Sequence, residues 1–317
     1  MTTDNPVKAV RFAVVLKTYS WDEFVHRQAS RCAVATGSGD FFISLDETNG
    51  SVSSIPFERV VRTSNADLVA SGLPNRFEKG SLIWWNPDYV HYQFCDRHPD
   101  YDYYVFVEYD ALIHGSFEPI VERASAMNVD MVSLPISSVK QDWFWTPFHR
   151  QTYGLAELQG SLIAVTAFSR RALDVLGQRR REMGARGQTR YWPNAEVFLP
   201  TEIARNNLNH CSLAEFGSIA GYSWFPPILE DDLHAATETA FLHPVLDRKR
   251  YIRSILKWPG EVAVFFQKGS EMRLKLARFG REEYMPLLFA AARRRLYVKF
   301  TDKLDRYKMR LIRNSLL

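Results

Sequence analysis

Short apolar runs of strand length alternate with helical stretches along most of the chain, as far as about residue 246. The runs are nearly continuous in apolar residues, which is typical of strands that are buried on both faces of a sheet. Their alternation with helices predicts an α/β fold with a mostly parallel central sheet flanked by helices. The predicted strands are Arg11–Leu16, Asp40–Leu45, Arg59–Thr63, Tyr103–Val107, Asp130–Leu134 and Ser161–Ala167.

Capping residues predict where several of the helices begin. Asn86 is followed by a proline, a combination that favours a helix start, and the helix should end near Arg97, before the next proline. Ser169 and Asn194 are expected to cap two later helices, since their side chains accept hydrogen bonds from free backbone N–H groups.

The pattern changes from Asp247 onward to long, basic and mostly helical sequence. We therefore divide the chain into a domain of residues 1–246 and a C-terminal extension of residues 247–317. The extension carries 19 Lys and Arg against 7 Asp and Glu, whereas the domain carries 21 against 29. Such a basic extension suits nucleic acid, an anionic membrane surface, an acidic partner or a solvated helical face. Pro286 interrupts the apolar and basic residues of 271–300 and predicts two helices there.

Composition excludes several classes of protein. Of the 317 residues, 46% are hydrophobic and 24% charged, which excludes a disordered chain. The three cysteines lack C-x-x-C spacing, which argues against a disulfide framework and a zinc site and suits a reducing cytoplasm. No apolar run approaches the roughly 20 residues of a spanning helix, and the N-terminus lacks a signal-peptide pattern. We expect a cytoplasmic protein.

An acidic triplet, Glu108-Tyr109-Asp110, directly follows the most strand-like run of the chain. Residues two apart in a strand point to the same side, so the two carboxylates should converge while Tyr109 faces away. Ligands of open α/β sheets bind at the carboxyl ends of strands, and paired carboxylates suit Mg²⁺ or Mn²⁺. The alternative is that Glu108 and Asp110 are surface charges at the start of a loop.

A longer stretch around this triplet resembles a known group of enzymes. Trp85–Asp88, His98–Tyr104 and Glu108–Asp110 resemble bacterial and fungal glycosyltransferases, in which an N-x-D helix start precedes an aromatic strand that ends in E-x-D. The architecture is similar to the GT-A fold, whose D-x-D motif binds the metal and the diphosphate of a sugar nucleotide. The resemblance covers residues 10–246, with glutamate where the common motif has its first aspartate.

The resemblance implies roles for several residues. Asp110 would hold the metal, and Glu108 would contact the metal or the ribose. Phe241–Val245 resembles the late histidine–proline element that completes the metal shell in many GT-A enzymes, which makes His243 the candidate third ligand. Imidazole is a good ligand for Mn²⁺ beside carboxylates, and the alternative is a histidine hydrogen-bonded within a loop.

The ends of the first two strands are implied to hold the nucleotide. Tyr19 could stack on the base, Lys17 could approach a phosphate, and Asp46 could accept hydrogen bonds from the base or ribose. Packing of Tyr19 and a turn-forming role of Asp46 are the alternatives. The full set of residues expected to bind the donor is Lys17, Thr18, Tyr19, Asp46, Glu47, Glu108, Tyr109 and Asp110. No glycine-rich phosphate loop is present.

A catalytic base is expected on the helix that Asn194 caps. Glu196 stands in its first turn, in the region where inverting GT-A enzymes carry the base that takes the acceptor hydroxyl proton. Glu202 is the reserve candidate. The alternative for Glu196 is that it complements the helix dipole. Inverting and retaining chemistry both remain open.

These observations predict a metal-dependent glycosyltransferase that moves a sugar from a UDP- or GDP-sugar to a glycan or lipid-linked acceptor, in cell-surface or exopolysaccharide synthesis. Expected cofactors are Mn²⁺ or Mg²⁺. The extension is expected to contact an anionic membrane surface at the inner face, and the alternative is that it packs on the domain or on another copy of the chain. Nucleic acid is not expected as a partner. One alternative is a non-catalytic scaffold of membrane or polysaccharide machinery. The other, a Mg²⁺-dependent phosphohydrolase, would need an aspartate nucleophile where Glu108 stands.

Overall fold

The computed structural model describes residues 9–73, 82–136, 149, 152–187, 192–234, 238–257 and 263–315. The chain forms two compact units. The first consists of the residues up to Trp224 together with His234–His243. The second consists of Phe225–Leu233 and the chain from Pro244 onward.

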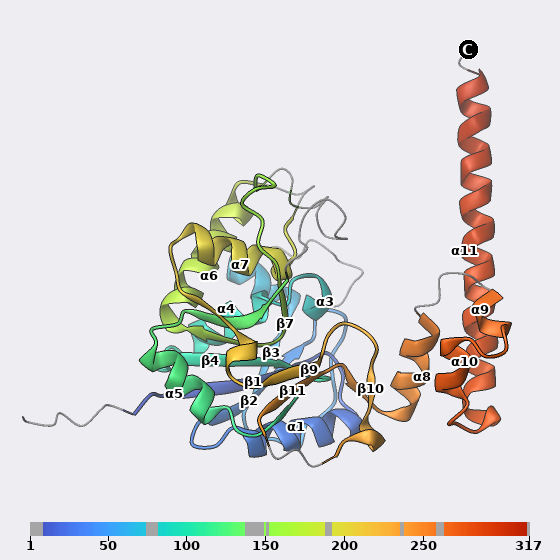
Figure 1. The fold of residues 1–317 in the computed structure, drawn as a ribbon. Coiled ribbons are helices and arrows are strands. Elements are labelled where there is room, and N and C mark those ends of the chain that lie inside the picture. The colour runs from blue at the N-terminus through green and yellow to red at the C-terminus, as the bar shows by residue number, and fades with distance from the viewer. Residues whose placement is uncertain are drawn as a thin grey trace, which may run out of the picture. The chain divides into compact units, whose positions relative to one another are not determined.

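The first unit is built on a seven-stranded sheet with the order β3-β2-β1-β4-β7-β6-β8 (Figure 1). β7 is antiparallel to both of its neighbours, and the other four pairings are parallel. The predicted α/β class with a mostly parallel sheet flanked by helices is therefore confirmed. The strands are β1 (Phe12–Thr18), β2 (Asp40–Asp46), β3 (Val60–Thr63), β4 (Tyr103–Glu108), β6 (Met131–Pro135), β7 (Ser161–Ser169) and β8 (His210–Ser212).

Helices cover both faces of this sheet, because its strands bury side chains on both. Phe12, Val14 and Leu16 of β1 join one apolar core, whereas Ala13 and Val15 join the other. The first core is covered by α1 (Glu23–Ala35) and α5 (Glu118–Ala126), and the second by α4 (Tyr89–Arg97), α6 (Arg170–Ala185) and α7 (Ala195–Arg205) (Figure 1). This alternation decides which side of the sheet each residue at a strand end faces.

A smaller sheet in the same unit has the order β5-β11-β9. Its strands are β5 (Leu112–His114), β9 (Ser218–Tyr222) and β11 (Ala240–His243). β11 runs antiparallel to β5 and parallel to β9. β5 begins two residues after Asp110, so its pairing with β11 brings the late part of the chain beside the acidic triplet. Gly217 permits the approach, since a Cβ there would lie 2.6 Å from the backbone oxygen of Thr239.

Two of the three predicted caps are confirmed and one is wrong. Ser169 accepts a hydrogen bond from the backbone N–H of Ala172 at the start of α6, and Asn194 accepts one from Glu196 at the start of α7. Asn86 does not begin a helix. The short α3 (Leu82–Trp85) ends directly before it, and the N–H of Asn86 closes the last turn on Leu82. The next helix, α4, begins at Tyr89 and ends at Arg97 as predicted.

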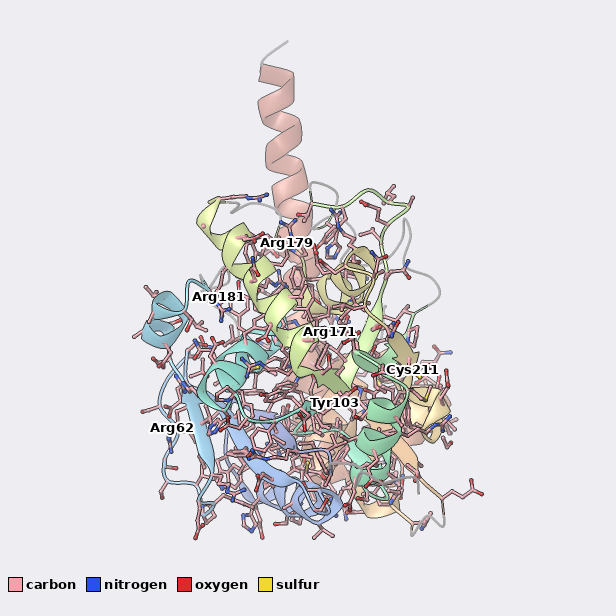
Figure 2. The ribbon with its side chains drawn as sticks, turned by 90° about the vertical axis from the view of Figure 1, so that its left-hand side faces the viewer. Arg62, Tyr103, Arg171, Arg179, Arg181 and Cys211 are labelled. Atoms are coloured by element: carbon pink, nitrogen blue, oxygen red, sulfur yellow. The ribbon has the colours of Figure 1, made fainter. Side chains whose placement is uncertain are left out.

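Arginines of α6 link this helix to its neighbours, and Figure 2 labels three of them along its length. Arg171 pairs with Asp130 at 2.6 Å, Arg179 pairs with Glu202 at 3.2 Å, and Arg181 pairs with Asp96.

Two further short helices belong to the first unit. The helix α2 (Asn65–Ala70) has a capping box made by Ser64 and Asp67, and η2 (Leu213–Glu215) follows β8.

The second unit has its own core, formed mainly by helices. Leu246, Ile252, Leu276 and Leu288 are among its buried residues. Its elements are β10 (Ile228–Leu229), η3 (Glu230–Asp232), β12 (Val245–Leu246), α8 (Arg248–Lys257), α9 (Ala263–Phe266), α10 (Glu271–Leu276) and α11 (Arg281–Ser315). The predicted helical character of the extension is confirmed. No helix in the described parts of the chain is both long enough and apolar enough to cross a bilayer.

The predicted break at Pro286 is wrong. Residues 271–300 do contain two helices, but the break lies between α10 and α11, and Pro286 lies inside α11. Gly280 precedes α11, and its N–H donates to Glu283 Oε1, as in half of a capping box. Pro286 removes one hydrogen bond near the start of the helix, while Tyr284 and Leu288 are buried on either side of it and hold the helix against the core.

Candidate metal and nucleotide site

The end of β4 positions the two acidic side chains of the triplet. Tyr104 and Phe106 face the core under α4, so Glu108 continues their row at the last position of the strand. The chain then turns tightly, with the N–H of Ala111 donating to the carbonyl of Glu108 at 2.8 Å. Asp110 lies within this turn. The two carboxylates converge because this turn brings Asp110 beside Glu108, and not through alternation along the strand, which ends at Glu108.

His243 joins the two carboxylates at the end of β11. Its Nε2 lies 3.8 Å from Glu108 Oε2 and 3.7 Å from Asp110 Oδ1. Its Nδ1 lies 2.8 Å from the carbonyl oxygen of Ser223, and because a carbonyl only accepts, Nδ1 carries the proton. Nε2 therefore faces the two carboxylates and is the nitrogen that could bind a metal. One ligand atom from each of the three residues lies within 4.8 Å of the others.

Lys17 lies next to Glu108 on the neighbouring strand, near the end of β1. It is fully buried, and its Nζ lies 3.5 Å from Glu108 Oε1. Burial lowers the pKa of Lys17, whereas the charge and hydrogen bond of Glu108 oppose this and favour the ammonium form. Because residues 13, 15 and 17 of β1 share one side of the sheet with residues 104, 106 and 108 of β4, this pairing follows from the strand register.

The cluster has the donor set of a site for a hard divalent cation. Glu108 lies beside the ammonium group of Lys17, and Asp110 lies beside the imidazole of His243. Burial raises the pKa of Asp110 to about 6, an effect that His243 opposes and Glu108 reinforces. Two carboxylates and an imidazole whose other nitrogen is held by a carbonyl are typical ligands of Mn²⁺, and the carboxylates also suit Mg²⁺. The residues therefore fit such an ion.

Two tyrosines predicted to bind the donor lie beside this cluster. Tyr19 follows β1 and is 45% exposed, and its hydroxyl lies 3.3 Å from that of Tyr109. The two rings pack edge to face with their centroids 5.6 Å apart. Thr18 is buried, and its hydroxyl donates to the carbonyl of Ser20, which shapes the turn that carries Tyr19. The strand ends thus present an exposed aromatic ring next to the acidic cluster.

Asp46 and Glu47 form the turn at the end of β2. The buried carboxylate of Asp46 accepts hydrogen bonds from the N–H and hydroxyl of Thr48 and from the N–H of Leu82, at 2.6–2.9 Å. Glu47 accepts hydrogen bonds from Arg62 and from the N–H of Val52. Both side chains therefore hold neighbouring parts of this unit together.

The two candidate bases lie in different surroundings on α7. Glu196 is partly buried in the first turn, and its Oε1 accepts a hydrogen bond from the indole N–H of Trp224 at 3.0 Å. Glu202 is almost completely buried, and its carboxylate accepts hydrogen bonds from the Tyr153 hydroxyl at 2.7 Å and from Arg179. Glu202 is thus enclosed within the protein, whereas Glu196 is accessible.

A buried polar group next to Lys17 did not follow from the sequence. Asp88 and Arg180 form a fully buried ion pair at 2.6 Å. Asn86 is also fully buried, and His91 stacks on Phe106 with centroids 3.9 Å apart. Among the described residues, neither ring nitrogen of His91 nor the side-chain amide of Asn86 has a hydrogen-bond partner. The only signal in the sequence was a set of polar residues within the apolar helical stretch that became α4.

Comparisons with known proteins give structural matches alone. No protein-family model matches the chain, and no curated protein matches its sequence. A glycosyltransferase involved in the glycosylation of the major capsid of PBCV-1 aligns with 9% identity and a TM-score of 0.35, over 64% of this chain and 81% of that one. Mouse xyloside xylosyltransferase 1 in its apo form aligns with 9% identity and a TM-score of 0.40, over 69% and 88%. These structural neighbours are glycosyltransferases.

Proposed function

We propose that residues 1–246 form a metal-dependent glycosyltransferase of the GT-A type, in which Glu108 and Asp110 are an E-x-D variant of the D-x-D motif. The observation that carries the proposal is the cluster of Glu108, Asp110 and His243 at the carboxyl end of a central strand. Ligands of open α/β sheets bind at this edge. The donor is a UDP- or GDP-sugar.

Asp110, Glu108 and His243 would hold Mn²⁺ or Mg²⁺. When bound, the ion would neutralise the charge of the donor diphosphate and so make it a better leaving group. The ion pair with Lys17 holds the Glu108 carboxylate in place, and the hydrogen bond to the Ser223 carbonyl fixes the ring of His243. Tyr19 offers its exposed face to the nucleoside base, and Asp46 and Glu47 maintain the neighbouring turn.

Glu196 is the proposed base of an inverting transfer. The acceptor hydroxyl oxygen attacks the anomeric carbon, the bond from that carbon to the diphosphate oxygen breaks, and its electron pair leaves with the nucleoside diphosphate. The acceptor proton moves to the Glu196 carboxylate, which is accessible, whereas Glu202 is enclosed. A positioned base of this kind contributes about 10²- to 10⁴-fold in rate.

A screen of sugar nucleotides tests the proposed function. We expect one UDP- or GDP-sugar to raise the melting temperature in the presence of Mn²⁺, because a ligand that binds only the folded state stabilises it. We also expect slow, metal-dependent hydrolysis of the same donor. If calorimetry with UDP, GDP and CMP in Mn²⁺ detects no binding, the proposal is rejected and a non-catalytic scaffold becomes the better account.

The acceptor and the location belong to the same proposal. We propose a glycan or lipid-linked acceptor in polysaccharide or lipopolysaccharide synthesis at the inner face of a membrane. Phe289, Leu296 and Phe300 are each more than half exposed, and their spacings of seven and four residues place them on one face of α11. Arg293–Arg295 and Lys299 lie among them. This combination is complementary to an anionic lipid surface.

Vesicle sedimentation tests the membrane contact. The full-length protein should bind phosphatidylcholine vesicles that contain phosphatidylglycerol at low salt, and release them at high salt. Each arginine contributes about 1 kcal/mol near such a surface, so Arg293→Ala should weaken binding about five-fold. Arg186→Ala, on the first unit, is the matched control. Equal sedimentation of Arg293→Ala, or no preference for phosphatidylglycerol, would show that this face of α11 has another partner.

A further inference from the structure

Trp224 lies at the end of the first unit. Its side chain is 41% exposed. The indole is nevertheless held in a defined position, because its N–H donates to Glu196 Oε1 at 3.0 Å. One edge of the ring is therefore anchored on the proposed base, while a substantial part of its surface faces solvent.

The three residues Tyr222–Trp224 connect the base to the metal cluster. The buried Tyr222 hydroxyl accepts a hydrogen bond from the backbone N–H of Val165 at 2.6 Å, which fixes the segment on β7. The carbonyl of Ser223 accepts the hydrogen bond from His243, and the next residue, Trp224, holds Glu196. One short segment thus positions both a metal ligand and the proposed base.

Ring contacts agree with this placement. The Tyr222 ring packs against the ring of His243, with their centroids 5.8 Å apart. Because Ser223 and Trp224 follow Tyr222 directly, one short segment holds both Glu196 and a residue of the acidic cluster. Trp224 is the exposed residue of this segment.

The chemistry of an anchored indole indicates what it binds. The face of an aromatic ring carries partial negative charge, so it attracts the polarised C–H bonds on the apolar face of a pyranose. A sugar stacked on Trp224 would have its hydroxyl groups around the ring edge, where Glu196 lies. A hydroxyl in that position could reach the carboxylate that is to take its proton.

On this basis we propose that Trp224 forms the acceptor subsite, stacking on a pyranose ring of the acceptor and positioning Glu196 through its indole N–H. The inference rests on the proposed function, since it takes Glu196 as the base. It identifies the acceptor as a glycan that presents a sugar ring, rather than a hydroxylated lipid or protein side chain that presents none.

Two substitutions separate the two parts of the proposal. Trp224→Phe keeps an aromatic face but loses the N–H, so kcat should fall roughly ten-fold while the KM for the acceptor stays within about two-fold. Trp224→Leu loses both, so the acceptor KM should also rise roughly ten-fold. Trp84→Leu is the matched control, because Trp84 is 61% exposed in the same unit but lies on α3.

The probes are p-nitrophenyl hexosides, with binding followed by saturation-transfer NMR and transfer followed by product formation. Donor affinity in Mn²⁺ should be the same in all variants, and a change there would indicate a purely structural effect. The inference is overturned if wild-type protein binds none of the hexosides, or if Trp224→Leu binds and uses them as well as wild type. The proposed function fails differently, through the absence of donor binding in the wild-type protein itself.

Discussion

Replacing Asp110 with asparagine is expected to abolish metal-dependent binding of the donor nucleotide. The substitution keeps the size of the side chain but removes the one carboxylate of the cluster that no described lysine or arginine pairs with. Loss of a residue that only supports a metal ligand costs about 10- to 100-fold in affinity, so loss of a charged ligand should cost more than about 100-fold. Calorimetry with UDP or GDP in Mn²⁺ measures the effect.

The fold should survive this change, because Asp110 lies in the turn after β4 and not within the strand. The melting temperature without metal should therefore stay near that of the wild type. Asp174→Asn is the matched control, since it makes the same chemical change in a surface ion pair with Arg170. His243→Ala should weaken metal binding less than Asp110→Asn, because the lost ligand is neutral. Near-normal nucleotide affinity of Asp110→Asn in manganese would reject the metal assignment.

Replacing Glu196 with glutamine is expected to lower turnover by about 10²- to 10⁴-fold, the usual contribution of a positioned general base. Glutamine keeps a side-chain oxygen that can accept the hydrogen bond from Trp224, so the local structure should be retained. Donor binding should also be unchanged, since Glu196 is not among the candidate metal ligands. Initial rates of transfer, together with donor affinity from calorimetry, separate these two effects.

Glu202→Gln provides the comparison on the same helix. Glu202 accepts hydrogen bonds from Tyr153 and Arg179, so its replacement should lower the melting temperature. Its effect on turnover should be smaller than that of Glu196→Gln. If Glu202→Gln were inactive while Glu196→Gln retained its activity, the base would be misplaced. If both variants remained fully active, a retaining reaction without such a base would be the better account.

The architecture of the central sheet could be predicted because it depends on local pattern. Apolar runs such as Tyr103–Val107 mark buried strands, and the alternation of strands with helices favours parallel pairing. The caps at Ser169 and Asn194 are equally local, since each needs only one side chain and the next turn of backbone. The reversed direction of β7 did not follow, because strand direction depends on the whole connection and not on the strand itself.

Local rules failed where packing outweighed propensity. Asn86 has the residue type of a cap but is buried between α3 and α4. Pro286 should interrupt a helix, yet buried Tyr284 and Leu288 hold α11 in place on both sides of it. In both places the free energy of burying neighbouring apolar side chains exceeds the preference of a single residue.

The sequence by itself determined the fold class, which follows from the alternation of strands and helices, and it determined that Glu108 and Asp110 lie together at the end of one buried strand. Only the tertiary structure decided what surrounds that pair. The pairing of β11 with β5 brings His243 to the two carboxylates, and the register of β1 against β4 places Lys17 next to Glu108. The hydrogen bond from Trp224 fixes the position of the Glu196 carboxylate on α7. These contacts join residues that are far apart along the chain, and the free energy that fixes them comes from burial and pairing across the whole unit, which no local pattern contains.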